Sequence, residues 1–514
     1  MLVIGAGPVG LGTALLLARR GVPTIVCEVA TEHQIVGSRS ICTQRDVIDI
    51  FARIGCAEEL LDEGVTWRTG RTFYREHELV TVNFPDPGGA ALPPWINISQ
   101  ASVEGRLLER VAAEPLVDLR WGCELTALSQ DDAGVTVRTS QDEFRGDYLV
   151  AADGARSTAR RLLGVDFPGE SYVDKFLIAD IRAELPFPNE RRFHFDPEWN
   201  PGRQVLVHQC PDSVWRIDWQ VPPDYDLEAE RASGALDARI RRITGDRPYE
   251  MVWLTVYRFH ERCAEEFRVG RVFLAGDAAH LYAPFGARGL NSGMQDAENL
   301  AWKLAYALRG WGTGTLLDSY HVERRAAARE NLRVTSETMR FLAPQSDAEW
   351  AARRDVLERA VTDPGARRHI NSGKLAEPYW YLDSPLTTPD GGADDFPAAP
   401  GAPRPPVAGV LCPDPPCLLP GGRRGRLREL FGGGFVVLAD DPEGVRSAAA
   451  AAVGAPVAAY PLKELDLDGA VRSALGATDR SVHLVRPDGH LAAALPDADP
   501  GAVAAAVRRA CGGQ

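Results

Sequence analysis

The first ten residues restrict the fold more than any other part of the chain. The apolar pair Val3-Ile4 is followed at once by the turn Gly5-Ala-Gly7-Pro8-Val9-Gly10, and helical periodicity continues to Arg20. A strand, a glycine-rich turn and a helix in this order open a βαβ unit. Gly5 permits the tight turn, Gly7 lets a phosphate approach the backbone, and Gly10 lets helix and strand pack closely. The turn, Pro8 and Val9 included, is therefore predicted to bind a dinucleotide at the helix N-terminus.

A carboxylate at the end of the next predicted strand supports this interpretation. Residues 23–27 form a strand-like run that ends at Glu28. A carboxylate in this place accepts hydrogen bonds from the ribose hydroxyls of an adenosine, and it disfavours a 2′-phosphate. The predicted ligand is therefore NAD- or FAD-like rather than NADP-like. The alternative is a glycine turn that binds no ligand.

The residues that follow two further predicted strands distinguish FAD from NAD as the ligand. Asp153 follows the predicted strand 148–152, and Asp277 follows the predicted strand 272–275. A carboxylate such as Asp277 can hold the ribityl hydroxyls of a long flavin dinucleotide. Beyond it, the backbone N–H groups of Gly289, Leu290 and Asn291 open a predicted helix, whose dipole favours negative charge on a flavin ring. These features indicate FAD.

Composition excludes several classes of protein. The net charge of -14 argues against a nucleic-acid partner, because no basic tract offsets it. No apolar run is long enough for a transmembrane helix, so no membrane partner is expected. The N-terminus lacks the basic segment of a secretory signal. The nine cysteines are scattered without a Cys-x-x-Cys pair, which predicts reduced thiols, a cytoplasmic protein and no metal site.

The pattern along the chain predicts an α/β protein with an inserted antiparallel sheet. Strand-like segments at 204–210 and 214–221 flank a turn, which is typical of a hairpin. Pro, Gly and Asp accumulate in a predicted linker, and strands and a closing helix return after it. The expected organisation is a discontinuous Rossmann-like dinucleotide-binding domain (1–174 and 263–385), a substrate-binding sheet domain (175–262), a linker (386–427) and a small C-terminal α/β domain (428–514).

Three motifs in order carry a resemblance to a known family. GAGPVG, AADGARSTAR and RVFLAGDAAHLYAPFGARGLNSGMQDAENLAWKL together resemble the class A flavoprotein monooxygenases with the para-hydroxybenzoate hydroxylase fold. The subgroup that fits comprises the 3-(3-hydroxyphenyl)propionate and polyketide aromatic hydroxylases, and the match covers about residues 1–330. The resemblance implies FAD as cofactor, with Arg39 and Gln100 as further FAD ligands and Arg45 as a second arginine candidate.

The C-terminal stretch LVRPDGHLAA resembles the thioredoxin-like domain of the same subgroup. Without a Cys-x-x-Cys pair it implies no redox role, but packing or a dimer contact, in a monomer or a homodimer. The flavin turn departs from the common family pattern, since it reads Ala283-Pro284 and Gly286-Ala-Arg288-Gly289. Pro284 is expected to shape the active site, and Arg288 either places a positive charge beside the flavin or faces solvent.

The resemblance also implies a reaction. NADPH or NADH reduces FAD, oxygen adds to give the C4a-hydroperoxide, and one oxygen atom is transferred to a phenolic or polyketide aromatic ring. The small-molecule partners are therefore an aromatic substrate and O2. Only one GxGxxG motif is present, so the nicotinamide cofactor would bind transiently. Alternatives are Baeyer–Villiger oxygenation of a polyketide by the same fold, and a non-catalytic flavin-binding protein. A flavin-dependent halogenase is disfavoured, because the tryptophans near Pro222 have the wrong spacing.

Catalytic candidates lie in the predicted sheet domain. Alternation along 214–221 places Arg216, Asp218 and Gln220 on one face, opposite an apolar face. Arg216 resembles the arginine of hydroxybenzoate hydroxylase that binds the substrate carboxylate, and the alternative is a solvated sheet face. His208 and Tyr257, on neighbouring predicted strands, could each polarise a phenol hydroxyl.

Overall fold

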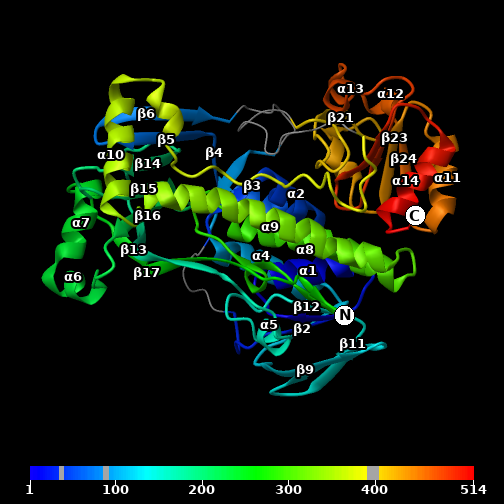
Figure 1. Ribbon diagram of the computed structural model, residues 1–514, viewed down its shortest axis with the longest axis horizontal. Coiled ribbons are helices and arrows are strands. Elements are labelled where there is room, and N and C mark those ends of the chain that lie inside the picture. Colours follow the sequence, from blue (N-terminus) through cyan, green and yellow to red (C-terminus); the bar gives the residue numbers. More distant parts are fainter. Residues whose placement is uncertain (34–39, 85–91, 391–403, 514) are drawn as a thin grey trace.

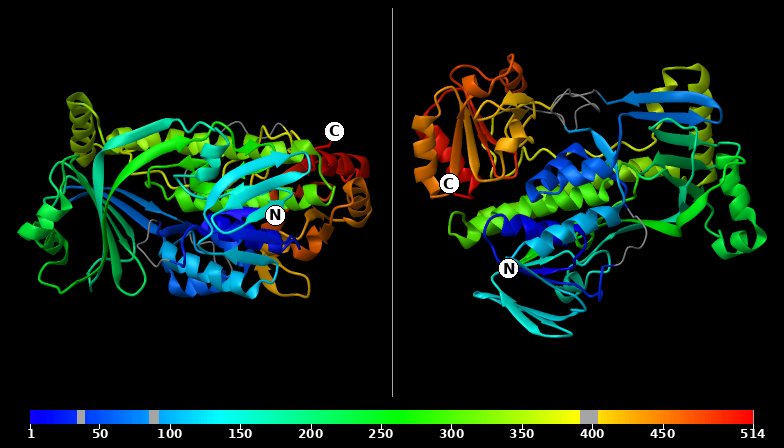
Figure 2. Two further views of the ribbon diagram at one scale, coloured as in Figure 1. Left: turned by 90° about the horizontal axis from the view of Figure 1, so that it is seen from below. Right: turned by 180° about the vertical axis from the view of Figure 1, so that it is seen from behind.

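The computed structural model describes residues 1–33, 40–84, 92–390 and 404–513. Figures 1 and 2 show an elongated molecule with a large twisted sheet at one end and a small C-terminal unit at the other. A parallel sheet with its helices occupies the middle. The long helix α9 (Gly314–Leu342) runs along the molecule between the two ends (Figure 1).

The N-terminal residues form the predicted βαβ unit at the centre of the parallel sheet. The strand order is β18-β19-β12-β1-β2-β8, and β1 (Leu2–Ile4) pairs in parallel with both β12 and β2. The helix α1 (Pro8–Ala18) packs against α8 (Gly289–Leu308) and α4 (Gln100–Ala113). The other strands of this sheet are β2 (Thr24–Cys27), β8 (Val117–Arg120), β12 (Leu149–Ala151), β18 (Arg268–Val269) and β19 (Val272–Leu274).

Smaller elements surround this sheet. A three-stranded sheet of β9, β10 and β11 lies beside it, and β3, β7 and β4 form another near the large sheet. Their bounds are β3 (Cys42–Gln44), α2 (Arg45–Ile54), α3 (Ala57–Glu63), β4 (Val65–Trp67), β7 (Trp95–Asn97), β9 (Leu125–Asp131), β10 (Gly134–Thr139), β11 (Glu143–Gly146), α5 (Thr158–Leu162) and the 3-10 turn η1 (Gly276–Ala278).

The large sheet has the order β20-β17-β13-β16-β15-β14-β5-β6 in the described residues. The predicted hairpin is present, since β15 and β16 pair antiparallel with His208 opposite Arg216. The strands β5 and β6 lie in the sequence range expected for the dinucleotide-binding domain. They join the large sheet instead, because β5 pairs with the distant β14. The strands are β5 (Thr69–Tyr74), β6 (His77–Asn83), β13 (Gly169–Arg182), β14 (Arg191–Phe195), β15 (Gln204–Gln209), β16 (Val214–Val221), β17 (Glu250–Cys263) and β20 (His280–Leu281).

The two faces of the large sheet have different partners. The apolar face, which carries Trp215, Ile217 and Trp219, packs under α6 (Leu227–Ser233) and α7 (Ala235–Thr244). The opposite face packs against α9, α10 (Asp347–Thr362) and the turn that contains Phe285. The alternation predicted for 214–221 is therefore confirmed. Its polar face is buried rather than solvated, since Arg216 is only 3% exposed.

The C-terminal unit has the expected thioredoxin-like topology. The strand order is β24-β23-β25-β26, with β23 and β24 parallel and the other pairs antiparallel. Helices α11 and α14 pack together on the sheet. The elements are β23 (Phe435–Ala439), α11 (Glu443–Val453), β24 (Val457–Pro461), α12 (Leu462–Leu465), α13 (Ala470–Leu475), β25 (Val482–Val485), β26 (Leu491–Leu495) and α14 (Pro500–Ala510).

The linker expected at 386–427 is shorter than predicted. Its second part forms β21 (Pro416–Leu418) and β22 (Arg424–Arg426), followed by the 3-10 turn η3 (Leu427–Leu430). Cys412 and Cys417 are buried in the core of the C-terminal unit. Among the described residues, none of the helices combines the length and apolarity that crossing a membrane requires.

A buried ion-pair network joins the C-terminal unit to the rest of the molecule. Both carboxylate oxygens of Glu323 on α9 accept hydrogen bonds from the Arg486 guanidinium, at 2.6 and 3.0 Å. Glu323 also accepts from Lys303 Nζ at 2.7 Å and from Ser384 Oγ at 2.6 Å. Arg486 in turn contacts Asp488 at 2.5 Å. Arg486 and Asp488 belong to the RPDGH stretch, whose role in this structure is packing between the units.

A second group of ion pairs fixes the same unit to α2. Arg428 donates to Asp46 at 2.6 Å, Arg426 donates to Asp49 at 2.9 Å, and Arg404 also contacts Asp46. Burial raises the pKa of Asp46, but the charges of Arg404 and Arg428 outweigh it and hold this pKa below its usual range. The ionised carboxylates are therefore part of the folded state at neutral pH.

Candidate functional site

The candidate site lies at one edge of the parallel sheet, where the ends of several strands converge. The carboxyl ends of β2, β1, β12 and β19, which are neighbours in one parallel sheet, meet at the same edge. Glu28, the turn that starts at Gly5, Asp153 and Asp277 follow these strands in that order. Ligands of open α/β sheets bind outside the carboxyl ends of the strands. The edge therefore offers polar groups along the length of an extended ligand.

The glycine turn has an open position where a phosphate would approach. In the described residues, no atom lies within 4 Å of a Cβ placed on Gly7, whereas a Cβ on Gly10 would lie 1.9 Å from the Gly5 carbonyl oxygen. Gly10 is therefore required for close packing, and Gly7 leaves space for a ligand. No described side chain caps the N-terminus of α1. Its N–H groups and positive dipole end suit the pyrophosphate of a dinucleotide.

The carboxylates of the edge have different local roles. Glu28 accepts hydrogen bonds from the backbone N–H groups of Ala6 at 2.7 Å and Ala30 at 2.9 Å, which fix it beside the glycine turn. Asp153 accepts from Ser157 Oγ at 2.5 Å and from a backbone N–H of α5, so it also orders its own loop. Asp277 lies in η1, directly after β19, and is partly exposed.

The start of α8 presents backbone donors beyond this edge. Gly289 is exposed, and no described atom lies within 4 Å of a Cβ placed on it. Pro284 is exposed in the same turn, while Phe285 is buried. The side chain of Asn291 accepts a hydrogen bond from Gln44 N at 3.0 Å, so this residue also ties α8 to the segment 42–44.

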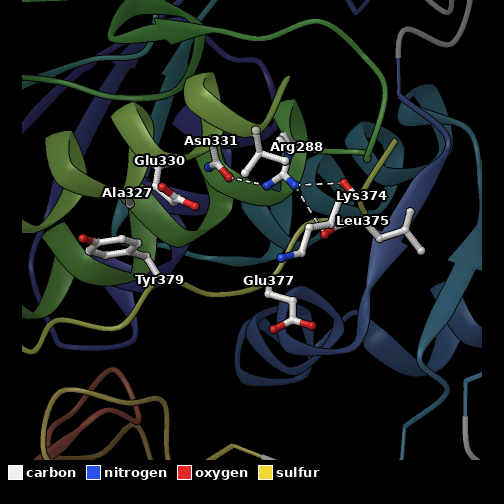
Figure 3. Close-up of a pocket in the computed structure, with 9 residues that line it drawn as sticks. Arg288, Ala327, Glu330, Asn331, Lys374, Leu375, Glu377 and Tyr379 are labelled. Carbon is white, nitrogen blue, oxygen red and sulfur yellow. Dashed lines mark hydrogen bonds between the residues drawn. The ribbon is translucent and has the colours of Figure 1, made fainter. Parts of the chain in front are cut away.

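Arg288 does not face solvent. It is only 4% exposed and donates to Asn331 Oδ1 at 2.5 Å and to the carbonyl oxygens of Lys374 and Leu375 at 2.9 and 3.4 Å (Figure 3). Burial lowers the pKa of Arg288 to about 10. The guanidinium fixes the turn to α9 and to the segment that crosses it, and it lines a shallow cleft together with Asn331 and Lys374.

A buried hydrogen-bond network centred on Asp296 lies behind the turn, and the sequence did not predict it. Asp296 on α8 accepts hydrogen bonds from Gly276 N at 2.9 Å, Arg324 Nε at 2.6 Å and His280 Nε2 at 2.7 Å. These contacts connect the Gly-Asp motif to α8 and α9. The local signal is a carboxylate on the buried side of an amphipathic helix, in the stretch MQDAENLAW. That signal identifies a buried acid without identifying its partners.

Three other expected ligands differ in what the structure places around them. Arg39 lies outside the described residues. Gln100 is the first residue of α4, and its side chain donates to Glu104 at 2.8 Å. Arg45 begins α2, on the side that faces the C-terminal unit, and burial lowers its pKa. The expected roles of Gln100 and Arg45 in FAD binding stay predictions.

The sheet residues proposed for catalysis are partly separated. Arg216 donates from Nε and Nη2 to both carboxylate oxygens of Asp180, each at 2.7 Å, so its charge is already paired. His208 lies opposite Arg216 and is buried, and burial together with the Arg191 and Arg216 charges lowers its pKa well below the usual value. Tyr257 is 45% exposed on β17. The expectation that His208 and Tyr257 occupy neighbouring strands is wrong, because β13 and β16 lie between them.

The ion pair between Arg216 and Asp180 leads to a testable prediction. Asp180→Asn should lower the free energy of unfolding by about 3 kcal/mol, because it leaves a buried guanidinium uncompensated. Denaturant unfolding measures this change. Asp237→Asn is the control, because Asp237 pairs with Arg241 on the exposed surface of α7, where solvent screens the pair, and its effect should be much smaller. Equal effects of the two substitutions would contradict a structural role of the pair.

Comparisons with known proteins agree with this geometry. Residues 1–335 match the FAD binding domain family, and residues 405–513 match the family of aromatic-ring hydroxylase C-terminal domains. The chain belongs to the FAD-dependent aromatic-ring hydroxylases. The cofactor of this hydroxylase is FAD, and the open edge and the start of α8 fit it.

Two similar proteins match 96% and 70% of the hydroxylase. A 3-(3-hydroxy-phenyl)propionate/3-hydroxycinnamic acid hydroxylase of Mycobacterium sp. (strain KMS) is 30% identical over 520 residues, 96% of this chain and 88% of the relative. The rifampicin monooxygenase of Streptomyces venezuelae is 34% identical over 365 residues, 70% of this chain and 74% of the relative.

Solved structures show the same architecture. The flavin-dependent monooxygenase PieE, in complex with FAD and substrate, has a TM-score of 0.84 and 25% identity, and the match covers 100% of this chain and 99% of that one. Aklavinone-11 hydroxylase, in a ternary complex with FAD and aklavinone, has a TM-score of 0.79 and 26% identity, with 99% and 98% covered.

Proposed function

We propose that this hydroxylase uses NADPH or NADH and O2 to hydroxylate a phenolic or polyketide aromatic ring. One observation carries the proposal: the polar face of β16 is turned toward the same turn, 282–288, that leads into the donors at the start of α8. The cluster that joins the large sheet to this turn contains Phe176, Phe259 and Phe285, whose rings lie 4.5 to 5.8 Å apart. Aromatic rings at this spacing form a well-ordered apolar wall.

The chain's own residues would bind and orient the reactants. When bound, FAD would take electrons from the nicotinamide cofactor and supply activated oxygen near the turn. Gly7 and α1 would hold the pyrophosphate, Glu28 the adenosine ribose and Asp277 the ribityl chain. The N–H groups that open α8 would stabilise negative charge on the ring. The proposed FAD ligands are Gly5, Gly7, Pro8, Val9, Gly10, Glu28, Gln100, Asp153, Asp277, Pro284, Gly289, Leu290 and Asn291.

The substrate would lie between the turn and the polar sheet face. Hydroxylation needs an electron-rich ring, and the compounds for which two similar proteins are named, 3-(3-hydroxyphenyl)propionate and aklavinone, each contain one. A second wall comes from Trp67 and Trp95, whose rings stack 5.9 Å apart beside His208. Aromatic walls of this kind would favour a planar substrate by apolar contact rather than by charge.

The test is oxidation of NADPH and NADH by purified, FAD-loaded protein with a panel of phenols and polyketide aromatics. We expect one aromatic class to accelerate oxidation and to yield a product that is one oxygen atom heavier. Mass spectrometry and NMR of that product separate ring hydroxylation from Baeyer–Villiger insertion, because only the latter places oxygen between two carbon atoms. Bound FAD without acceleration by any aromatic compound would contradict the proposal.

A further inference from the structure

Asp218 occupies the centre of the sheet face that is turned toward the flavin turn. It lies on β16, two residues after Arg216, between Ile178 of β13 and Leu206 of β15. Ile178 and Leu206 belong to the same apolar cluster as Phe285 of the turn. Strand geometry places Asp218 on their side of the sheet. In this row of the sheet the Asp218 carboxylate therefore lies between two apolar side chains, next to the row that holds Asp180, Arg216 and His208.

This carboxylate has an unused oxygen. Asp218 Oδ1 is covered from solvent and has no hydrogen-bond partner among the described residues. The residue as a whole is partly accessible, unlike its buried neighbour Arg216. Buried polar atoms are nearly always hydrogen-bonded, so an orphaned carboxylate oxygen calls for a missing partner. A substrate hydroxyl is a donor of the right kind.

The charges around Asp218 leave it without a dedicated cation. Arg216 is the nearest basic group, but Asp180 already holds its guanidinium through two hydrogen bonds. The thiols of Cys42 on β3 and Cys210 after β15 also feel the Asp218 charge, and burial raises their pKa values far enough to keep them neutral. Burial raises the pKa of Asp218 to about 7, with Arg216 lowering it and Asp180 raising it.

The other titratable groups near Asp218 are less suited than its carboxylate to accept a proton. His208 is neutral, and its Nδ1 also has no partner among the described residues. Burial lowers the pKa of Arg191 on β14 to about 10, and its Nη2 donates to the carbonyl oxygen of Ser372 at 2.6 Å. A histidine with a strongly lowered pKa is a weak base, whereas a carboxylate that titrates near neutrality is a competent one.

The Cys42 thiol, which feels the Asp218 charge, belongs to a segment that is hydrogen-bonded to the start of α8. The carbonyl oxygen of Cys42 accepts a hydrogen bond from Asn291 Nδ2 at 3.0 Å, and Asn291 lies in the first turn of α8. Cys42, Ala287 of the flavin turn and Trp67 share one small apolar cluster. Asp218 therefore lies on the sheet face that packs toward the turn before α8, where the flavin ring is proposed to lie.

We propose that Asp218 is the general base that accepts the proton of the substrate's phenolic hydroxyl, an inference that rests on the proposed function. The O–H bond of the phenol breaks, the proton moves to a carboxylate oxygen of Asp218, and the electron pair stays on the phenolate oxygen. Delocalisation of that pair raises electron density at the ortho and para ring carbons, where oxygen is accepted. The step consumes no oxidant, and the proton returns to the product phenolate.

The experiment compares Asp218→Asn with the unchanged hydroxylase, both loaded with FAD, from pH 5.5 to 9. The probe is 3-hydroxycinnamic acid, or the aromatic compound that most accelerates NAD(P)H oxidation in the panel. The unchanged enzyme should gain hydroxylation rate as pH rises through about 7, because Asp218 must be ionised. At pH 8 the variant should lose about 100-fold in kcat and the pH step, with FAD binding unchanged. A more acidic nitrophenol should lose less, because it needs less help from a base.

Three controls make the outcome decisive. Asp174→Asn makes the same change at a nearby sheet carboxylate that is partnered by Gln220 at 2.6 Å, and it should keep both rate and pH profile. Asp218→Glu should restore part of the rate and shift the pH step. His208→Gln should keep the step. An Asp218→Asn enzyme that retains kcat within threefold, or loss of the step in His208→Gln instead, would overturn the assignment. If no phenol accelerates the unchanged enzyme, the proposed function itself fails.

Discussion

Glu323→Ala is expected to lower the free energy of unfolding by about 4 kcal/mol and to loosen the C-terminal unit. Glu323 is fully buried and accepts hydrogen bonds from Arg486, Lys303 and Ser384. Its removal leaves the buried Lys303 without its counter-charge and leaves Arg486 with Asp488 alone, which is costlier than the loss of the network as a whole. Denaturant unfolding measures the change in stability, and limited proteolysis detects release of the C-terminal unit.

The control for this prediction lies on the same helix. Glu337→Ala removes a carboxylate that pairs with Arg333 on the exposed side of α9, so it should change stability by less than about 1 kcal/mol. If the two variants unfold at the same denaturant concentration, the network contributes no more than a surface pair.

The same network predicts a dependence on pH. Burial alone would raise the pKa of Glu323. The charges of Arg486 and Lys303 outweigh this effect, so the folded-state pKa lies below the usual value. A carboxyl of this kind stabilises the fold above its unfolded-state pKa, about 4.3, and the contribution is lost as pH falls toward the folded-state value. The stability difference between the unchanged protein and Glu323→Ala should therefore be full at pH 7 and shrink below pH 4. A stability difference that stays constant from pH 7 to below pH 4 would contradict this prediction.

Gly7→Asp is expected to weaken FAD binding by roughly a hundredfold, about 2.7 kcal/mol, while the protein stays folded. The backbone of Gly7 has a φ of -72°, which any residue adopts, and a Cβ there meets no described atom within 4 Å. The new carboxylate would occupy the place of the pyrophosphate and repel it at the end of α1. Fluorescence titration of the apoprotein with FAD measures the affinity.

Two glycine variants separate ligand binding from folding. Gly164→Asp adds the same charge at an exposed turn with no described atom within 4 Å of its Cβ, and FAD affinity should not change. That position has a φ of +67°, so a small loss of stability is expected. Gly10→Ala should unfold the turn instead, because its Cβ would lie 1.9 Å from the Gly5 carbonyl oxygen. Unchanged FAD affinity in Gly7→Asp would contradict the assignment of the turn.

Local sequence determined the parts of this hydroxylase in which neighbours along the chain supply the physics. The strand, glycine turn and helix at 2–18 follow from apolar pattern and backbone freedom, and so does the carboxylate at the end of β2. Alternation along β16 assigned its two faces, because side chains on a strand point to opposite sides whatever the strand pairs with. The motif order then identified the family and FAD.

Tertiary structure decided which of these polar side chains are available for a ligand. Asp180 on β13 and Arg216 on β16 are distant in sequence, and strand pairing alone brings them into a buried ion pair. Asp218, two residues further along, has no such partner for one oxygen. The local pattern gives both residues the same face and cannot distinguish them. The difference arises because burial makes each charge depend on the groups across the sheet, and those groups are fixed only when distant strands pair.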